Sequence, residues 1–180
     1  LKPGCQFSRV GIEQRLDNRV LDLRTPANQA LFRIRSGITA EFRNYLSSKG
    51  FMEIQTPKII GQSSEGGSAI FKVEYFDRQA YLAQSPQLYK QMCIAAGFEK
   101  VFEVGPVFRA ENSLTNRHLT EFTGLDLEMN IKTNYREVIN LLLDMLFHMI
   151  KNIYSKYEKE METIAVQYPI TKIILPESSD

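Results

Sequence analysis

Apolar residues recur with a helical period in three segments of the chain. The first helix should begin at Thr25-Pro26, because threonine caps a first turn and proline lacks an amide hydrogen that would be unpaired there. A glycine at position 50 should end this helix. Its expected apolar face carries residues at three- and four-residue spacing: Leu31, Ile34, Ile38, Phe42 and the pair Tyr45 and Leu46.

The other two helical segments lie further along the chain. Pro86 should open a helix that ends at Gly97. Asn134 and Glu137 form a capping box, in which each side chain accepts from an amide of the first turn, so they predict the start of a long helix. We expect this helix to run to about Met161. Its apolar face should carry Val138, Leu141, Leu142, Met145, Met149 and Ile153.

Short runs with strand character lie between the first helix and the last. These runs cover residues 51–55, 71–75, 80–83, 101–108 and 122–130. In the last run the faces alternate: Leu125, Leu127 and Met129 point one way, and Phe122, Asp126 and Glu128 point the other. Because neighbouring strands follow one another with few helices between them, we expect an α+β fold with a mostly antiparallel sheet flanked by helices.

Composition narrows the class of protein only a little. The 180 residues include 22 basic and 21 acidic residues, and the net charge of +1 argues against a protein that coats nucleic acid or an anionic membrane. Two cysteines are too few for a disulfide scaffold. Residues 141–150, the most apolar run, are too few and too polar to span a bilayer, and residues 1–20 show no signal peptide. We therefore expect a cytoplasmic protein without a membrane partner.

Charged and aromatic residues gather around the loop between the last two strands. The loop and its edges carry Arg109, Glu111, Arg117, His118 and Phe122. The cations suit a polyphosphate, because planar guanidinium donors match phosphate oxygens, and the phenyl ring offers a flat face for a base. A surface hairpin with solvated charges explains these residues equally well. The carboxylates of Asp126 and Glu128, which share a strand face with the aromatic ring, favour a functional site.

A second group of polar residues surrounds the helix start at Pro86. Gln87 and Lys90 are three residues apart and share a helix face, and the ammonium of Lys90 suits a carboxylate ligand. The commoner fate of such a lysine is to extend from a surface helix into water. A third group, the glycine-containing loop of residues 64–68, fits either a lid with Glu65 facing an ammonium or a plain connection.

Four of these segments, in this order, resemble the class II aminoacyl-tRNA synthetases, and among them the aspartyl-tRNA synthetases of the eukaryotic cytosol. The helix over residues 27–49, the strand 51–55 and Pro57 are similar to motif 1, the dimer-interface element of the family. Residues 101–129, with Phe-Arg-Ala-Glu and Arg-His-Leu-Thr-Glu-Phe, are similar to motif 2, the ATP-binding hairpin. The Ser-Glu-Gly-Gly-Ser loop resembles the flipping loop over the amino acid, and residues 84–90 resemble the segment that recognises aspartate.

The resemblance implies a role for each matching residue. Arg109 would be the catalytic residue, in contact with both the α-phosphate of ATP and the α-carboxylate of the amino acid. The implied ATP-binding residues are Arg109, Ala110, Glu111, Arg117, His118, Leu119 and Phe122. The implied aspartate-binding residues are Glu65, Ser85, Gln87, Leu88, Tyr89, Lys90, Arg109 and Asp126. Pro57 would belong to the dimer interface, and the resemblance implies no metal ligand within this chain.

The resemblance also implies a reaction and its partners. L-aspartate and ATP would give aspartyl-adenylate and pyrophosphate, and the aspartyl group would then pass to the 3′ end of tRNA(Asp). Mg²⁺ would accompany ATP, with its main ligands outside this chain. We expect a cytoplasmic homodimer formed through motif 1, which could join a larger multi-synthetase assembly.

Parts of the family's pattern are missing from the 180 residues. Motif 3, a glycine-rich element with an arginine over ATP, does not occur in the sequence. Residues 1–20 resemble the hinge arm that follows an anticodon-binding domain, and residues 21–180 resemble the first part of the catalytic domain. We therefore expect a fragment with an incomplete sheet, which does not aminoacylate tRNA on its own.

Three other functions compete with aspartate activation. Asparaginyl-tRNA synthetases are similar around motifs 1 and 2 but typically lack a lysine at the position of Lys90. A buried cation suits the β-carboxylate of aspartate and does not suit an amide, so Lys90 favours aspartate. A synthetase-like paralogue would bind amino acid and ATP without catalysis, and the joint presence of Arg109, Glu111, Phe122 and Lys90 argues against it. A domain that only dimerises would leave the polar strand faces unexplained.

Overall fold

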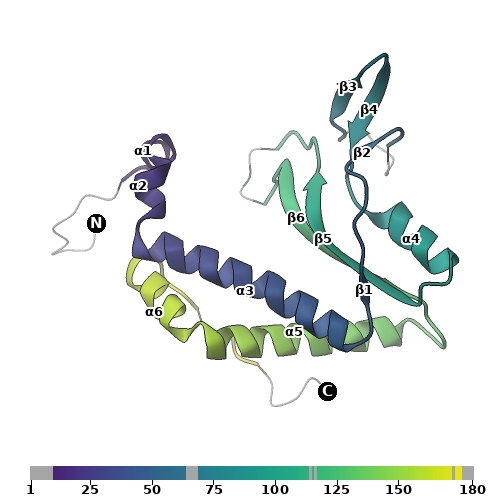
Figure 1. Cartoon of the computed structure of the whole chain (residues 1–180). Coiled ribbons are helices and arrows are strands. Elements are labelled where there is room, and N and C mark those ends of the chain that lie inside the picture. Colours follow the sequence, from purple (N-terminus) through teal and green to yellow (C-terminus); the bar gives the residue numbers. More distant parts are fainter. Residues whose placement is uncertain (1–9, 64–68, 114, 116, 172, 176–180) are drawn as a thin grey trace. The chain divides into compact units, whose positions relative to one another are not determined.

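The computed structural model describes residues 10–63, 69–113, 115, 117–171 and 173–175 of the 180-residue chain. The chain divides into two compact units, one of Leu1–Ile38 with Phe147–Asp180 and the other of Thr39–Leu146. The helices α3 (Pro26–Ser48) and α5 (Arg136–Lys156) each continue from one unit into the other (Figure 1). Helices occur together with two small sheets, which confirms the α+β fold expected from the sequence.

The first sheet has β5 (Lys100–Phe108) at its centre. β6 (Glu121–Met129) pairs antiparallel with β5 along all nine residues of the strand. β1 (Met52–Glu53) pairs with β5 in parallel, so this sheet is mixed. The strands predicted over 51–55, 101–108 and 122–130 are confirmed, although the first contains only two residues.

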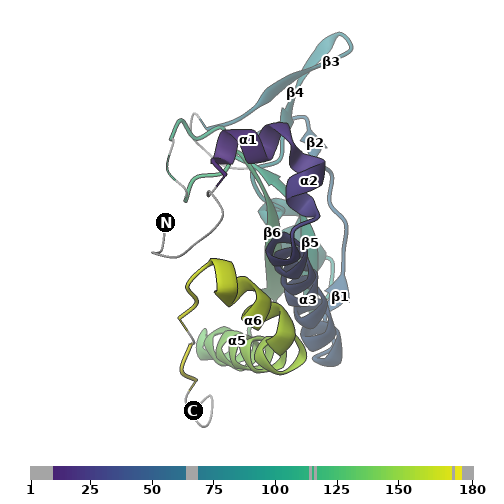
Figure 2. The same ribbon diagram turned by 90° about the vertical axis from the view of Figure 1, so that its left-hand side faces the viewer.

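The second sheet is antiparallel throughout, in the order β2-β4-β3. β3 (Lys72–Tyr75) and β4 (Arg78–Leu82) form the hairpin expected from the runs 71–75 and 80–83. β2 (Ile59–Ile60) has no signal in the sequence, because two residues give no period to detect. In Figures 1 and 2 the β3–β4 hairpin projects past the ends of β5 and β6.

Two glycines end helices at the predicted positions. Gly50 follows the end of α3, and Gly97 follows α4 (Gln87–Ala95), which begins directly after Pro86. Their φ angles of +80° and +94° are disfavoured for any residue with a side chain. Glycine therefore lets the backbone turn away from each helix at little cost.

The core of the larger unit joins the C-terminal part of α3 to β5. The ring of Phe42 meets the edge of the Phe102 ring, with 5.8 Å between their centroids. Leu46 and Val101 are fully buried in the same unit. Burial of these apolar side chains stabilises β5, the strand at whose end the candidate site begins.

The first half of α3 packs through small residues. Ala30 and Gly37 are buried and Ile34 is half-buried, whereas Leu31 is 43% exposed and Ile38 is 36% exposed, so small residues supply most of the buried positions in this part of the helix. A side-chain carbon on Gly37 would lie 2.5 Å from the ring of Tyr157, so glycine is required for this ring to approach. A periodic pattern of large residues cannot reveal a packing face made of small ones.

The C-terminal helix predicted to reach Met161 ends earlier, at Lys156, and α6 (Glu158–Gln167) follows it. Tyr157 separates the two helices, with φ −120° and ψ 28°, and its ring lies against Gly37. The prediction of one continuous helix is wrong because this contact joins segments that are far apart in the sequence. No helix in the described part of the chain is long and apolar enough to cross a membrane.

The start of α5 has the predicted capping box. The amide of Asn134 donates to Glu137 Oε1 at 3.2 Å, and the amide of Arg136 donates to Asn134 Oδ1 at 2.9 Å. Of the predicted apolar face, the residues that are buried are Met145, Met149 and Ile153. Leu142 is exposed, which the helical period does not predict.

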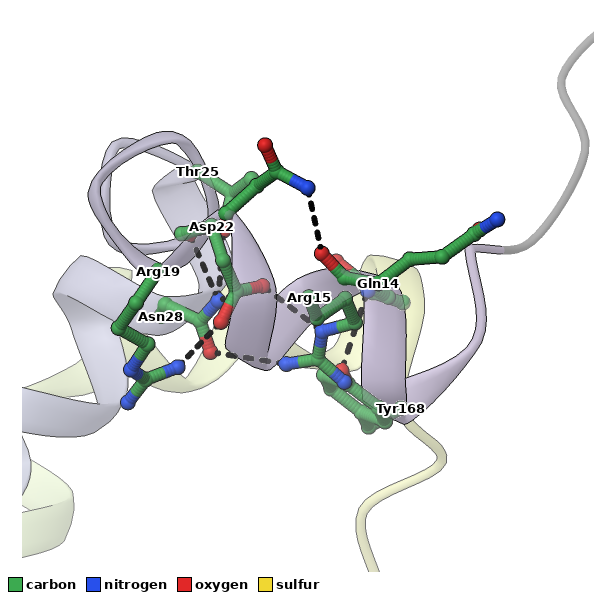
Figure 3. Close-up of polar contacts among 9 residues, drawn as sticks. Gln14, Arg15, Arg19, Asp22, Thr25, Asn28 and Tyr168 are labelled. Atoms are coloured by element: carbon green, nitrogen blue, oxygen red, sulfur yellow. Dashed lines mark hydrogen bonds and ion pairs between the residues drawn. The ribbon is translucent and has the colours of Figure 1, made fainter.

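Two short helices precede α3 and cover Ile12–Asp17 (α1) and Arg19–Leu23 (α2). The hinge arm predicted for residues 1–20 overlaps α1, and this division of the chain stays a prediction. Figure 3 shows the cluster that stabilises these helices: Asp22 accepts from Arg15 Nε at 2.7 Å and from Asn28 Nδ2 at 2.8 Å. The Arg15 hydrogen bond is the main cause that lowers the pKa of Asp22. Because Asn28 lies on α3, the cluster fixes α2 at the start of that helix.

Candidate active site

A pocket of about 310 Å³ opens where β5 ends and β6 begins. It is lined by Arg109, Glu111, Arg117, His118, Leu119 and Phe122. These are six of the seven residues to which the resemblance assigns ATP. The seventh, Ala110, does not line the pocket, and its amide donates to the carbonyl of Ala69 at 3.1 Å. The hairpin therefore gathers cationic, acidic and aromatic groups around one cavity.

Arg109 is held by its backbone and by its side chain. Its amide donates to the carbonyl of Thr120 at 3.0 Å, which extends the ladder between β5 and β6. Its guanidinium carbon lies 5.7 Å from the centroid of the Phe122 ring, a cation–π distance. Its Nε donates to the carbonyl of Gln84 at 3.5 Å. A planar cation held from two sides suits bidentate contact with a phosphate or carboxylate.

His118 is held by polar residues of the loop. Its Nδ1 lies 2.6 Å from Thr115 Oγ1 and 3.2 Å from Ser113 Oγ, and its Nε2 lies 3.7 Å from Glu111 Oε2. Both His118 and Arg117 are exposed at the mouth of the pocket. Exposed cations at the rim of a pocket attract an anionic ligand.

Lys90 lies on the first turn of α4 and is 3% exposed, although lysine is rarely buried. Its ammonium donates to the carbonyl of Leu127 at 3.1 Å and to Asp126 Oδ1 at 3.3 Å, and Glu128 Oε2 lies 3.6 Å away. The alternative of a lysine extended into solvent is therefore wrong. A buried ammonium costs free energy unless it is paired, and the two carboxylates of β6 supply that pairing.

Gln87 joins the same cluster from one turn earlier on α4. Its side-chain amide donates to Glu128 Oε2 at 3.2 Å, and its backbone amide lies 3.4 Å from Ser85 Oγ. Ser85, Gln87, Lys90 and Asp126, four residues to which the resemblance assigns aspartate, therefore lie around one junction between α4 and β6.

Two other residues assigned to aspartate, Leu88 and Tyr89, are not part of this cluster. Leu88 is exposed, and the 100° step of an α-helix places it and Tyr89 on other faces of α4 than Gln87 and Lys90. Glu65 and its loop lie outside the described residues. Their assignment stays a prediction.

The two groups of residues share one face of the first sheet. Phe122 at the pocket and Asp126 at the lysine cluster are four residues apart on β6, so their side chains point the same way, about 13 Å apart along the strand. Between them lies Gly124, which pairs with Gly105 on β5. Neighbouring side chains fill the space beside these two glycines: Asp126 Oδ2 would lie 2.7 Å from a side-chain carbon on Gly124, and Glu103 Oε1 would lie 3.1 Å from one on Gly105.

Sequence reasoning assigned no individual role to two buried polar residues, Gln84 and Glu103. Gln84 accepts from Ser63 Oγ at 3.1 Å and donates to the carbonyl of Ala69 at 3.1 Å. Glu103 is 1% exposed at the centre of β5. A carboxylate within the apolar run 101–108 was the available signal for Glu103, whereas Gln84 left no such signal among its polar neighbours.

The described residues contain no group of three or more His, Cys, Asp or Glu side chains arranged to hold a metal ion. Asp126 and Glu128 are paired with the ammonium of Lys90, so this lysine, rather than a metal ion, compensates their charges. The described residues of the site therefore do not fit a resident Mg²⁺.

Similarity to known proteins agrees with this arrangement. The family model for tRNA synthetases class II (D, K and N) matches residues 11–179. The cytoplasmic aspartate–tRNA ligase of Bos taurus is 57% identical over 160 residues, which are 89% of this chain and 32% of that protein. The chain therefore spans about a third of the length of this relative.

Two solved structures from Entamoeba histolytica compare the aspartate and asparagine enzymes. The aspartyl-tRNA synthetase matches with a TM-score of 0.81 and 46% identity, over 96% of this chain and 32% of that one. The asparaginyl-tRNA synthetase in complex with asparaginyl-adenylate matches with a TM-score of 0.76 and 30% identity, over 92% of this chain and 36% of that one. The fold is common to both, and the sequence is closer to the aspartyl enzyme. With its family model matched along nearly the whole length, this chain belongs to the class II tRNA synthetases of the D, K and N group.

Proposed function

We propose that this chain forms part of an aspartate–tRNA ligase and carries its binding sites for L-aspartate and ATP. Membership of the family and the higher identity to aspartate enzymes support the proposal. The buried ammonium of Lys90 is the single observation that carries the choice of aspartate. Lys90 is paired with Asp126 and Glu128, and its positive charge favours a ligand that carries a carboxylate over one that carries a neutral amide.

In this proposal the pocket at the hairpin holds ATP. Phe122 stacks on the adenine, and Glu111 accepts from the adenine amino group. Arg117 and His118, exposed at the pocket mouth, meet the terminal phosphates. The lining of one cavity by all four residues supports these roles.

Arg109 acts at the reacting centre. An oxygen of the aspartate α-carboxylate attacks the α-phosphorus of ATP, a P–O bond forms, and the bond to the pyrophosphate leaving group breaks. The guanidinium of Arg109 stabilises the negative charge that develops on the α-phosphate oxygens. Because no side-chain nucleophile is needed, the chain contributes positioning and electrostatic stabilisation.

The amino acid lies at the junction of α4 and β6. Lys90 and Gln87 face the β-carboxylate of aspartate, and Ser85 helps to orient the amino acid. Asp126 attracts the α-ammonium, together with Glu65 from the loop of residues 64–68. Because Asp126 and Phe122 share one face of β6, the α-carboxylate of the bound aspartate faces the α-phosphate held by Arg109.

The partners follow from the same proposal. The aspartyl group passes from the adenylate to the 3′ end of tRNA(Asp) in the cytoplasm, and Mg²⁺ arrives with ATP on ligands outside this chain. Residues 21–180 supply the first part of the catalytic domain, after a hinge arm over residues 1–20. Exposed Leu31 and Phe32 on α3, and exposed Pro57 after β1, support a homodimer through motif 1. In this proposal the dimer can join a larger multi-synthetase assembly.

Charging of tRNA by the full-length protein tests this function. The protein is incubated with ATP, unfractionated tRNA and either aspartate or asparagine, and the amino acid esterified to tRNA is identified by mass spectrometry. We expect aspartyl-tRNA alone. Asparaginyl-tRNA would place the chain with the asparagine enzymes, and ATP binding without charged tRNA would indicate a paralogue that has lost catalysis.

A further inference from the structure

Glu103 is a buried carboxylate to which none of the roles above is assigned. It lies at the centre of β5 and accepts three hydrogen bonds: from the amide of Thr56 at 3.0 Å, from Thr56 Oγ1 at 2.7 Å and from the ammonium of Lys58 at 2.9 Å. Lys58 Nζ also lies 2.9 Å from Thr56 Oγ1. A carboxylate that is 1% exposed is tolerated only with such complete pairing, so this geometry is tightly specified.

The ion pair lies on the sheet face that carries the site. Glu103 is directly opposite Asp126 in the antiparallel register, and directly paired residues point to the same face. A side-chain carbon on Gly105 would lie 3.1 Å from Glu103 Oε1 and 3.4 Å from Lys58 Cε. Gly105 therefore makes room for the pair, on the sheet face that carries both proposed binding sites.

Lys58 connects Glu103 to the strand end that holds Arg109. The carbonyl of Lys58 accepts from the amide of Ala83 at 2.9 Å, and the carbonyl of Ala83 accepts from the amide of Phe108 at 3.0 Å. The next carbonyl, that of Gln84, accepts from Arg109 Nε at 3.5 Å. These contacts form a continuous series of interactions that begins at Glu103 on β5 and ends at Arg109, directly after β5.

We infer that Glu103 is a positioning residue for Arg109, which it orients through Lys58 and the Ala83–Gln84 segment. The inference rests on the proposed function, because it takes Arg109 as the group that stabilises the reacting phosphate. Glu103 fixes the side chain of Lys58, Lys58 fixes Ala83, and the neighbouring carbonyl of Gln84 fixes the guanidinium. A misplacement of about 1 Å at a reacting group can lower a rate about 100-fold, so an anchor remote from the substrate can control the rate.

If the ion pair serves only the stability of the fold, its substitution should have a different effect. Removing one partner of a buried pair leaves an uncompensated charge and destabilises the protein, whereas replacing both partners is often neutral for stability. If the pair only stabilises the fold, activity should return together with stability when both charges are removed. If Glu103 positions Arg109, stability should return while the rate stays low.

The experiment uses the full-length protein and four variants: E103Q, K58M, the double variant E103Q/K58M and the control K72M/E74Q. The control removes the same two charges from exposed positions of β3. Aspartate-dependent exchange between ATP and pyrophosphate gives kcat and KM, melting gives stability, and calorimetry gives the Kd of ATP. We expect the double variant to melt near the wild type while its kcat falls about 10- to 100-fold and its KM for aspartate changes less. The control should match the wild type.

Recovery of the wild-type kcat in the double variant, or a fall in kcat no larger than that of the control, would overturn the inference. The failure of the proposed function looks different, because the wild type itself would then show no exchange with aspartate. In that case the Kd of ATP still tests whether Glu103 positions Arg109. A weaker Kd of ATP in the double variant than in the control supports positioning of Arg109, and an unchanged Kd refutes it.

Discussion

Glu103 on β5 and Asp126 on β6 lie directly opposite each other, and each carboxylate has its own lysine. Lys58 lies 2.9 Å from Glu103, and Lys90 lies 3.3 Å from Asp126. Like charges at directly opposed positions destabilise a sheet, so the two lysines make this pairing possible. Two lysines therefore compensate three carboxylates on this sheet face, Glu103, Asp126 and Glu128, and we expect the loss of one lysine to affect the other pair as well.

Replacing Lys90 with methionine should abolish binding of aspartate. The substitution removes the cation proposed for the β-carboxylate and leaves Asp126 and Glu128 without their partner. Truncating one partner of a buried, hydrogen-bonded charge pair between protein and ligand costs about 2–5 kcal/mol of binding free energy, so aspartate affinity should fall at least about 30-fold. Calorimetry with aspartate and with ATP measures both affinities, and the ATP affinity should be largely kept.

Lys100→Met is the matched control for this experiment, because the Lys100 ammonium contacts only the Lys49 carbonyl and the Phe51 ring among the described residues. It should leave both affinities unchanged. An unaltered aspartate affinity in Lys90→Met would refute the role assigned to Lys90.

Replacing Phe122 with alanine should weaken ATP binding selectively. The ring supplies the proposed stacking face and lies 5.7 Å from the guanidinium of Arg109. Stacking of a base on an aromatic ring contributes about 1–3 kcal/mol, so the Kd of ATP should rise about 5- to 150-fold. Phe98→Ala, which removes a ring that is not among the pocket residues, is the control. Equal losses of ATP and aspartate affinity would point to a general structural defect.

Glu137 should make stability depend on pH. Hydrogen bonds from the amides of Thr133, Lys132 and Asn134 lower the pKa of Glu137 below its ordinary value of 4.5. Its stabilising effect is therefore present above pH 4.5 and is lost as the pH falls through the lowered pKa. Glu137→Gln should lower the melting temperature of the protein at pH 7, and the difference from the wild type should shrink in acid. A difference that is constant with pH would show that ionisation of Glu137 has no part in the cap.

Replacing Phe76 with glycine should stabilise the protein. Phe76 has a φ of +54° at the tip of the β3–β4 hairpin, and its side chain is 91% exposed, with an edge-to-face contact to the ring of Tyr75 at 4.9 Å between centroids. This conformation costs a residue with a side chain about 1–2 kcal/mol, and glycine adopts it freely. The melting temperature should rise for Phe76→Gly and should not rise for Phe76→Ala, which keeps the strain. A fall for Phe76→Gly would show that the ring makes a contact worth more than the strain.

Local signals in the sequence predicted most of the elements. Thr25-Pro26, Pro86, Gly50 and Gly97 mark the helix ends that the structure shows, because each acts through its own backbone. The alternation along 122–130 predicted which residues share the face of β6, and the structure places Asp126 and Glu128 together on Lys90.

What the sequence could not predict depends on contacts between distant segments. The break at Tyr157 follows from packing against Gly37, and the burial of Lys90 requires carboxylates from a strand that follows α4 by some 30 residues of chain. Glu103 is paired with Thr56 and Lys58, and these residues, distant in the sequence, lie beside β5 only in the folded protein. Periodicity indicates the helix or strand to which a residue belongs, but it does not indicate which distant residues that residue contacts.

The most direct test of the central claim is amino-acid-dependent exchange of pyrophosphate into ATP by the full-length protein. Aspartate and asparagine are supplied separately at saturating concentration, and exchange is followed with labelled pyrophosphate. The site around Lys90 predicts exchange with aspartate and none above background with asparagine. Exchange driven by asparagine, or equal exchange with both, would contradict the assignment of aspartate to this site.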